Sequence, residues 1–321
     1  MPSKLTSILT LVFIFCGWAN AQAIEGVSRA KKVEIKPPGY VETAEPAPEP
    51  VEAFPTSDID IEIPATTLSN PSAVGVVIGI TKYAHPDVPQ VDYARRDARL
   101  MREYLIQTMG YREENIITAI DEEATKASFN RIFEGQLANY ITPGESDVFI
   151  YYSGHGAPDV ENASAYFVPH DADPNYASQT GYSLDQFYRQ LNDLDVRSMT
   201  VVLDACFSGG SEAGMLIQEA SPIFISVENP AANLSNGVVL TSSSGDQISS
   251  WYREKGHGLF TYFFLKGLRG EADGDQDGKV TSEEVFGYLM ENVPYLARRL
   301  FNREQIPQLM GGTMDQTLVE Y

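Results

Sequence analysis

Buried strands and amphipathic helices alternate along the chain after residue 72. Short apolar runs rich in β-branched residues recur, and the stretches between them carry apolar residues at helical spacing, as in Ala94, Ala98, Met101 and Leu105. The predicted strands cover residues 74–80, 115–120, 148–152, 199–203 and 238–242. The predicted helices cover residues 93–108, 126–140, a stretch that begins at 183, 259–267 and 283–301. This alternation predicts an α/β fold with a mostly parallel central sheet and helices on both faces.

Residues 24–71 lack such a pattern. A basic cluster at 29–36 precedes an acidic segment that contains eight prolines and no Lys or Arg. Few apolar side chains are available for burial there, so we expect an extended, mobile and disordered linker. The globular domain is then expected over 72–312, followed by a short C-terminal tail at 313–321.

The first 23 residues have the pattern of a secretory signal peptide. A basic residue near the start precedes an apolar stretch over 5–18 and a small-residue cleavage site, Ala-Asn-Ala, at 19–21. Cleavage would remove Cys16 and leave Cys206 as the single thiol, so we expect a secreted or periplasmic protein. The alternative is an uncleaved anchor, although the run is short for a hydrocarbon core of ~30 Å.

The formal net charge of −21 limits the classes of partner. Such a surface repels nucleic-acid phosphates and anionic lipid headgroups, so we expect neither nucleic acid nor, once the signal is cleaved, a membrane as a partner. The charge also suits plain solubility, and it would attract basic peptides.

Two short strings carry the candidate chemistry. Tyr-Tyr-Ser-Gly-His-Gly at 151–156 and Asp-Ala-Cys-Phe-Ser-Gly-Gly at 204–210 each follow a predicted buried strand. Because the carboxyl ends of parallel strands meet at one crevice, His155 and Cys206 are expected there as a base and a nucleophile. The backbone amides of Gly156 and Cys206 are the expected donors to the oxyanion of the reaction. The strings therefore predict a cysteine hydrolase.

Other roles for these residues remain open at this point. A free cysteine such as Cys206 is commonly a small core residue. A second Gly-His-Gly at 256–258 makes His257 a rival base, but it precedes a helix and we expect a capping or loop residue. His85 and His170 lack the glycine setting and are expected on the surface or in loops.

In these strings the chain resembles the caspase-like cysteine peptidases, and specifically the bacterial metacaspase-like branch of the caspase fold. In caspases the histidine lies about 50 residues before the cysteine, and here the gap is 51. The resemblance covers roughly residues 72–312. It implies a peptidase in which His155 and Cys206 form a catalytic dyad and pass through a thioester acyl-enzyme.

The resemblance also implies the specificity pocket. Asp204 stands where caspases carry a glutamine and metacaspases carry an aspartate that binds Arg or Lys. The second carboxylate of that pocket lies early in the first helix, where Arg96-Asp97-Ala98 is similar to the family's Asn-Asp-Ala string. Paired carboxylates suit a guanidinium, so a peptide or protein with a basic P1 residue is the expected substrate. Without the resemblance, Asp204 could equally be a strand-end residue bonded to loop amides, and Asp97 a helix-surface residue.

Residues 273–284 match the 12-residue calcium loop of an EF-hand. Oxygen ligands at positions 1, 3, 5, 7 and 12 suit Ca²⁺, with a glycine for the sharp turn at position 6. The expected ligands are Asp273, Asp275, Asp277, the carbonyl of Lys279, and Glu284. Only one such loop is present, and hydrogen bonds alone are an alternative way to hold it. We expect a structural rather than a sensing role for the ion.

These observations favour a secreted cysteine endopeptidase that cleaves after Arg or Lys. The alternatives are a non-catalytic binding or scaffold protein with the caspase fold, and a relative of gingipains or legumains with another specificity. No Lys or Arg occurs from 198 to 252, so we expect a single-chain catalytic domain that cannot cut itself after the cysteine. The basic cluster at 29–36 is the expected site of self-cleavage.

Overall fold

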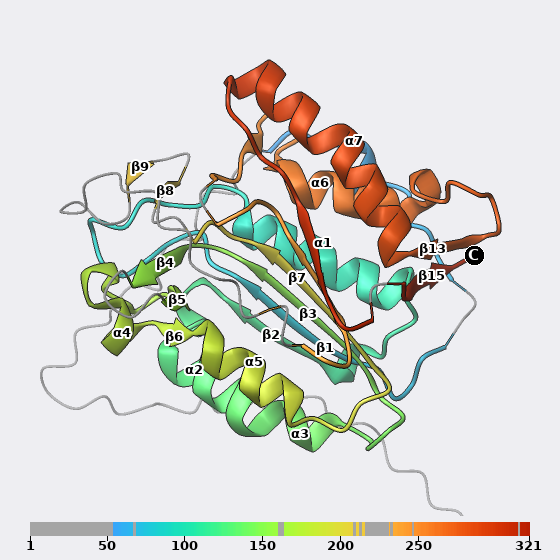
Figure 1. The fold of residues 1–321 in the computed structure, drawn as a ribbon, viewed down its shortest axis with the longest axis horizontal. Helices are drawn as coiled ribbons and strands as arrows, with labels where there is room; N and C mark the ends of the chain where they lie inside the picture. Colours follow the sequence, from blue (N-terminus) through green and yellow to red (C-terminus); the bar gives the residue numbers. More distant parts are fainter. Residues whose placement is uncertain are drawn as a thin grey trace, which may run out of the picture. The chain divides into compact units, whose positions relative to one another are not determined.

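A six-stranded sheet forms the centre of the protein (Figure 1). The computed structural model describes residues 54–66, 69–159, 164–207, 210–211, 214–215, 231, 234–245, 247–313 and 315–321. The strand order is β14-β10-β7-β3-β1-β2. These strands are β1 (Val74–Gly79), β2 (Ile116–Ile120), β3 (Asp147–Ser153), β7 (Ser198–Asp204), β10 (Val238–Thr241) and β14 (Gln308–Gly311). All neighbours are parallel except β14, which is antiparallel to β10, so the predicted sheet is confirmed.

Helices cover both faces of the sheet, as the alternating pattern predicts (Figure 1). One face is covered by α1 (Ala94–Gln107), α6 (Leu259–Lys266) and α7 (Ser282–Phe301). The other is covered by α2 (Lys126–Arg131), α3 (Leu137–Tyr140) and α5 (Leu184–Asn192).

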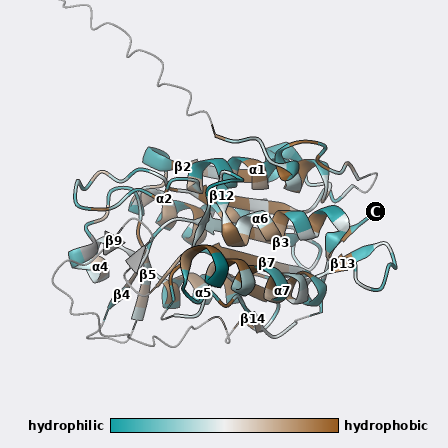
Figure 2. Cartoon of the chain, turned by 90° about the horizontal axis from the view of Figure 1, so that it is seen from above, coloured by the Kyte–Doolittle hydropathy of each residue, from teal (hydrophilic) through white to brown (hydrophobic). Residues whose placement is uncertain are grey.

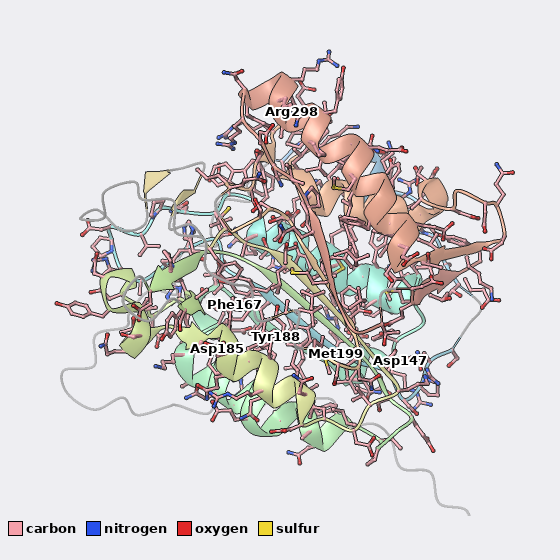
Figure 3. All side chains as sticks on the ribbon, viewed as in Figure 1. Asp147, Phe167, Asp185, Tyr188, Met199 and Arg298 are labelled. Atoms are coloured by element: carbon pink, nitrogen blue, oxygen red, sulfur yellow. The ribbon has the colours of Figure 1, made fainter. Side chains whose placement is uncertain are left out.

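The two faces of β3 show why both layers are needed. Successive side chains of a strand point to opposite faces, so Ile150 joins the core under α5 while Phe149 and Tyr151 join the core under α1 and α6. Figure 2 shows the central strands in brown and the outer parts of the helices in teal. Figure 3 places Phe167 and Tyr188 on the α5 side of the sheet, where both are almost completely buried.

Smaller elements lie at the edges of this framework. The π-helical turn Ile132–Gln136 joins α2 to α3 within the predicted helix 126–140, and a second one, Gly267–Glu271, follows α6. A three-stranded sheet and three two-stranded sheets complete the described strands, with the short helix α4 (Ala177–Thr180). They are β4 (Gly156–Asp159), β5 (Ser164–Phe167) and β6 (Tyr182–Ser183); β8 (Gly210–Ser211) with β9 (Gly214–Met215); β11 (Trp251–Tyr252) with β12 (His257–Gly258); and β13 (Lys279–Thr281) with β15 (Thr317–Glu320).

Asp147, labelled in Figure 3, links the two central strands at their amino ends. Its carboxylate accepts hydrogen bonds from the Arg197 guanidinium (Nε at 2.8 Å), the Ser198 hydroxyl (2.6 Å) and the Asn70 amide (2.6 Å). These bonds hold the pKa of Asp147 below its ordinary value, against the opposing effect of burial. With the amino ends aligned, the carboxyl ends of β3 and β7 also meet in register.

The prediction of a disordered linker over 24–71 is wrong for residues 54–66, which we call the amino-terminal strap. The strap contains a 3₁₀ turn at Asp58–Asp60 and runs along α1. Ile59 is completely buried in the α1–α6 core, and its carbonyl accepts a hydrogen bond from the Tyr104 hydroxyl at 3.0 Å. Near the other end, the carbonyl of Pro64 accepts a bond from the Thr108 hydroxyl at 2.7 Å. Composition alone missed this because one isoleucine and a few polar contacts are enough to order so short a segment.

The predicted tail at 313–321 is also part of the domain. Strand β15 pairs antiparallel with β13, and Leu318 and Val319 are buried. The four residues of β15 do not alternate between buried and exposed, so the sequence lacks the periodic pattern that identifies a strand.

The predicted signal peptide and the basic cluster at 29–36 lie outside the described residues. Among the helices that are described, none combines the length and the apolar character that crossing a bilayer requires.

If the strap is part of the folded unit, truncating its buried side chain must lower stability. We expect Ile59→Ala to lower the free energy of unfolding by roughly 3 kcal/mol, the usual cost of emptying a fully buried aliphatic site. Chemical denaturation measures the loss. Ile61→Ala is the matched control, because that side chain is 53% exposed, and it should change the free energy by less than about 0.5 kcal/mol. Equal effects of the two substitutions would show that the strap is not packed as described.

Candidate active site

The carboxyl ends of β3 and β7 bring the two predicted strings together. Ser153 lies opposite Asp204 in the parallel register. Beyond the strands, the Gly154 amide donates to the carbonyl of Asp204 (3.4 Å) and the Gly156 amide to the carbonyl of Cys206 (3.2 Å). The loops that carry the histidine and the cysteine are therefore bonded to each other on both sides of His155.

Four of the predicted site residues line one cavity at this end of the sheet, and Gly156 is not among its lining residues. The cavity holds about 30 Å³, room for a single water molecule. Trp251 and Tyr93, whose rings meet edge to face at 6.1 Å, form part of its walls. The lining residues include Asp97, His155, Asp204, Cys206, Ser249 and Gly258.

His155 is oriented as a neutral base. Its Nε2 lies 2.7 Å from the carbonyl of Pro89, and because a carbonyl only accepts, Nε2 carries the proton. Nδ1 is then the basic nitrogen. The backbone amide of His155 donates to the Tyr83 hydroxyl at 2.8 Å, which fixes the residue from behind. Burial lowers the pKa of His155 to about 4, so the ring is uncharged at neutral pH.

Cys206 is held as a thiol. Burial raises its pKa above the ordinary value, and its sulfur accepts a hydrogen bond from the Ser249 amide at 2.7 Å. Within the described part of the chain, no hydrogen bond joins the sulfur to the ring of His155. The two residues thus share the cavity as a neutral pair, not as a thiolate and an imidazolium.

The structure corrects the expectation for Gly156. Its amide is engaged by the Cys206 carbonyl and is not free to bind an oxyanion in this conformation. The glycine itself is required by packing, because a Cβ atom there would lie 2.3 Å from the Phe207 ring. The amide of Cys206, the other expected donor, has no acceptor among the described residues.

The two predicted pocket carboxylates are both buried beside Gly258. A Cβ atom at 258 would lie 2.6 Å from Asp204 Oδ2 and 3.1 Å from Asp97 Oδ2, so only a glycine fits between them. Asp204 Oδ2 accepts a hydrogen bond from the Thr261 hydroxyl at 2.7 Å. Burial, helped by the nearby charge of Asp97, raises the pKa of Asp204 to about 6. Asp97 is therefore not the helix-surface residue that its sequence alone allowed.

Helix α1 places Asp97 in the cavity because it packs very close to β1. A Cβ atom at Gly79 would lie 2.5 Å from the Ala94 carbonyl, so a larger residue there would push the helix away. Asp97 is 1% exposed and fully bonded: its Oδ2 accepts from the Gly258 amide at 2.8 Å, and its Oδ1 lies 2.5 Å from Nδ1 of His257.

His257 is the functional candidate that sequence reasoning missed. We expected a capping or loop residue, but it lies in β12 with no exposed surface. Its Nδ1 faces Asp97 and its Nε2 lies 3.1 Å from Oδ1 of Asp60. The two carboxylates raise its pKa although burial opposes this. The only sequence signal was the repeated Gly-His-Gly, and nothing in it named Asp60 as a partner.

The predicted calcium loop gathers its first three carboxylates. Oxygens of Asp273, Asp275 and Asp277 lie within 4.8 Å of one another. The turn at Gly278 has a φ of 84°, which suits a glycine. Glu284 faces the same loop, accepting from the Gly274 amide at 3.1 Å and from the Thr281 amide at 2.9 Å, and so also caps α7. Lys279 begins β13, whose partner is β15.

Comparison with known proteins decides the family. Residues 72–319 match the caspase domain family. The chain belongs to that family. Caspase-1 from Spodoptera frugiperda superposes with a TM-score of 0.54 at 12% identity, over 79% of this chain and 94% of that one. A protein from Geobacter sulfurreducens superposes with a TM-score of 0.52 at 17% identity, over 78% of this chain and all of that one. A comparison with curated protein sequences gave no match.

Membership confirms the caspase-like fold, and the members of this family are cysteine peptidases. At these identities the two structures establish the fold of the caspase domain and nothing finer about its site. The match also extends beyond 312 to include most of β15, in agreement with the structure.

The protonation states of the dyad can be tested through the reactivity of the thiol in this caspase domain. We expect the rate of Cys206 alkylation by iodoacetamide to keep rising past about pH 8.5, the pKa of an ordinary thiol, because burial disfavours the thiolate. Mass spectrometry of the Cys206 peptide measures the rate. In denaturant, the midpoint of the alkylation rate against pH should return to about pH 8.5. A plateau below pH 7 in the folded protein would instead show a resting thiolate–imidazolium pair.

Proposed function

We propose that the protein is a cysteine endopeptidase that cleaves after Arg or Lys. The observation that supports this most strongly is a single cavity lined by a cysteine, a histidine with a fixed tautomer, and two buried carboxylates. The family supports the cysteine peptidase class, and the carboxylates support the basic residue at P1.

In the proposed reaction, His155 acts first as a base. Cys206 leaves the Ser249 amide and gives its proton to Nδ1 of His155, while the sulfur attacks the carbonyl carbon of the scissile peptide. Pro89 keeps the proton on Nε2 and so keeps Nδ1 available. The oxyanion accepts from the Cys206 amide; Gly156 contributes only if its bond to the Cys206 carbonyl opens. The imidazolium then protonates the leaving amine, a thioester remains, and water hydrolyses it with His155 again as base.

The pocket binds the P1 side chain through charge-assisted hydrogen bonds. Burial raises the pKa of Asp204 to about 6. A guanidinium beside the carboxylate would lower that pKa, because an opposite charge favours the ionised form. Asp97 supplies the second carboxylate across Gly258. Two other functions are compatible with the sequence: a non-catalytic binding protein, and a peptidase with another P1 preference.

A panel of fluorogenic peptides ending in Arg, Lys, citrulline, Asp or Asn distinguishes these functions. We expect cleavage after Arg and Lys, and a loss of at least about 10³-fold in kcat for Cys206→Ala and for His155→Ala. Asp204→Asn should lower kcat/KM for Arg far more than for citrulline, which has the same shape without the charge. Asp185→Asn, an exposed aspartate on α5, is the matched control. No cleavage of any peptide by folded protein would favour the binding protein.

The same assay carries a pH signature. Below about pH 6, Asp204 takes up a proton and the pocket loses a charge, so kcat/KM for the Arg peptide should fall. For the citrulline peptide, kcat/KM should not fall in this pH range, because its side chain carries no charge. If kcat/KM fell equally for both peptides, the titrating group would belong to the dyad instead.

We also propose that residues 273–284 bind Ca²⁺, which supports the connection between α6 and α7. The support is the donor set: three carboxylates that converge on one point, oxygen ligands of the kind Ca²⁺ prefers, and Glu284 beside the same loop. Bound Ca²⁺ would neutralise the repulsion between the three aspartates. We expect Ca²⁺ to raise the melting temperature of the wild type, and Asp273→Asn with Asp275→Asn to abolish the increase. An equal increase in the double variant would contradict the site.

Export to the periplasm or medium, with cleavage of the first 23 residues and self-cleavage at 29–36, remains our proposal from the sequence. Amino-terminal sequencing of the wild type and of Cys206→Ala would give both cleavage points. An unprocessed amino terminus in the exported wild type would contradict it.

A further inference from the structure

The amino-terminal strap contributes a charged side chain to the surroundings of the proposed P1 pocket. The match to the caspase domain begins at residue 72, so the strap lies outside the matched residues. Its Asp60 lies 2.7 Å from the Arg96 guanidinium and 3.1 Å from Nε2 of His257. Asp60 thus reaches the histidine that Asp97 contacts from the opposite side.

His257 must carry two protons in this arrangement. Each of its ring nitrogens faces a carboxylate oxygen, and a carboxylate oxygen accepts hydrogen bonds. Only the imidazolium can donate to both. The surrounding charges agree, because Asp60, Asp97 and Asp204 approach β12 from the strap, α1 and β7, and the nearby cation Arg96 is bonded to Asp60. Asp60, His257 and Asp97 form a continuous array in which His257 and Asp97 are buried and Asp60 is partly exposed.

The strap is anchored well enough to hold Asp60 in place. Two residues earlier, Asp58 accepts bonds from Lys255 and Lys266 at 3.0 Å each and from the Tyr262 hydroxyl at 2.9 Å. The carbonyl of Asp58 accepts a bond from Arg269. Within the 3₁₀ turn, the Ser57 amide donates to Asp60 Oδ2 at 2.7 Å, which orients the Asp60 carboxylate directly.

We propose that the strap is part of the specificity site, with Asp60 and His257 as positioning residues that fix the Asp97 carboxylate for recognition of a basic P1 side chain. This rests on the proposed function, since it concerns the same pocket. His257 binds Oδ1 of Asp97, and together with the Gly258 amide it determines the plane of the carboxylate. The cation lies between the carboxylates of Asp97 and Asp60 and offsets their negative charge.

The charges show what His257 contributes to specificity. With Asp97 and Asp204 ionised and no cation beside them, two negative charges would share a buried cavity, and one of them would take up a proton. The imidazolium offsets one charge and leaves a net charge of about −1, which a single guanidinium or ammonium neutralises. Asp60 in turn keeps the imidazolium protonated. Removing Asp60 should therefore weaken recognition of charge at P1 without touching the dyad.

Binding to an inactive protein tests this without requiring turnover. In the Cys206→Ala protein, calorimetry gives the affinity for a peptide ending in Arg and for the same peptide ending in citrulline. We expect Asp60→Asn to lower the ratio of the two affinities about tenfold, the effect of one lost hydrogen bond to a charged group. Glu62→Gln removes the same charge from an exposed position of the strap and should leave the ratio unchanged. An unchanged ratio in Asp60→Asn would overturn the proposal.

A second measurement examines the array itself. Nuclear magnetic resonance of the histidine rings, with His257 assigned from the spectrum of His257→Gln, should show His257 doubly protonated at pH 7. In Asp60→Asn it should titrate about one pH unit lower. A neutral ring at pH 6 in the parent protein would overturn the array. If the Cys206→Ala protein prefers Arg but the wild type cleaves nothing, the peptidase proposal fails alone; if it does not prefer Arg, both proposals fail.

Discussion

The site depends on the parallel pairing of β3 with β7. Their register sets Ser153 beside Asp204, and the backbone bonds from Gly154 and Gly156 extend the pairing past the end of the sheet. A slip of one residue would turn every side chain of a strand to the other face, so the register is enforced by burial on both faces. The meeting of a histidine and a cysteine 51 residues apart is thus a consequence of core packing, not of contacts between their own side chains.

Burying so many charges at one point is costly, and the structure shows how the cost is offset. A buried ion is tolerated when its partners are close and its remaining lone pairs are bonded. Asp97 has His257 and the Gly258 amide, and Asp204 has the Thr261 hydroxyl. Within the described part of the chain no cation pairs with Asp204, and burial together with the charge of Asp97 raises its pKa to about 6. In the proposed function, a basic P1 side chain gains most of its binding free energy from its ion pair with Asp204.

The sequence predicted the helices, the convergence of His155 with Cys206 and every strand of the central sheet except β14, because buried strands and strand ends leave strong local patterns. It did not predict the strap or β15, where only one or two buried side chains anchor an otherwise polar segment to the core. The array through His257 was beyond sequence reasoning for a different reason. Its three members come from the strap, α1 and β12, and no periodicity relates residues that meet only in the folded chain. The engaged amide of Gly156 likewise required coordinates.

The resting geometry links recognition to reactivity in the proposed enzyme. The thiol is bonded to Ser249, the base is neutral, and the cavity admits little more than a water molecule. Ser249 and Trp251 belong to the same short stretch, and both line that cavity. In the proposed reaction, a basic side chain that moves this stretch as it enters would also draw the Ser249 amide away from the sulfur. The free energy gained from the carboxylates would then be used to release the nucleophile, so that the peptide best bound at P1 is also the one that activates the thiol.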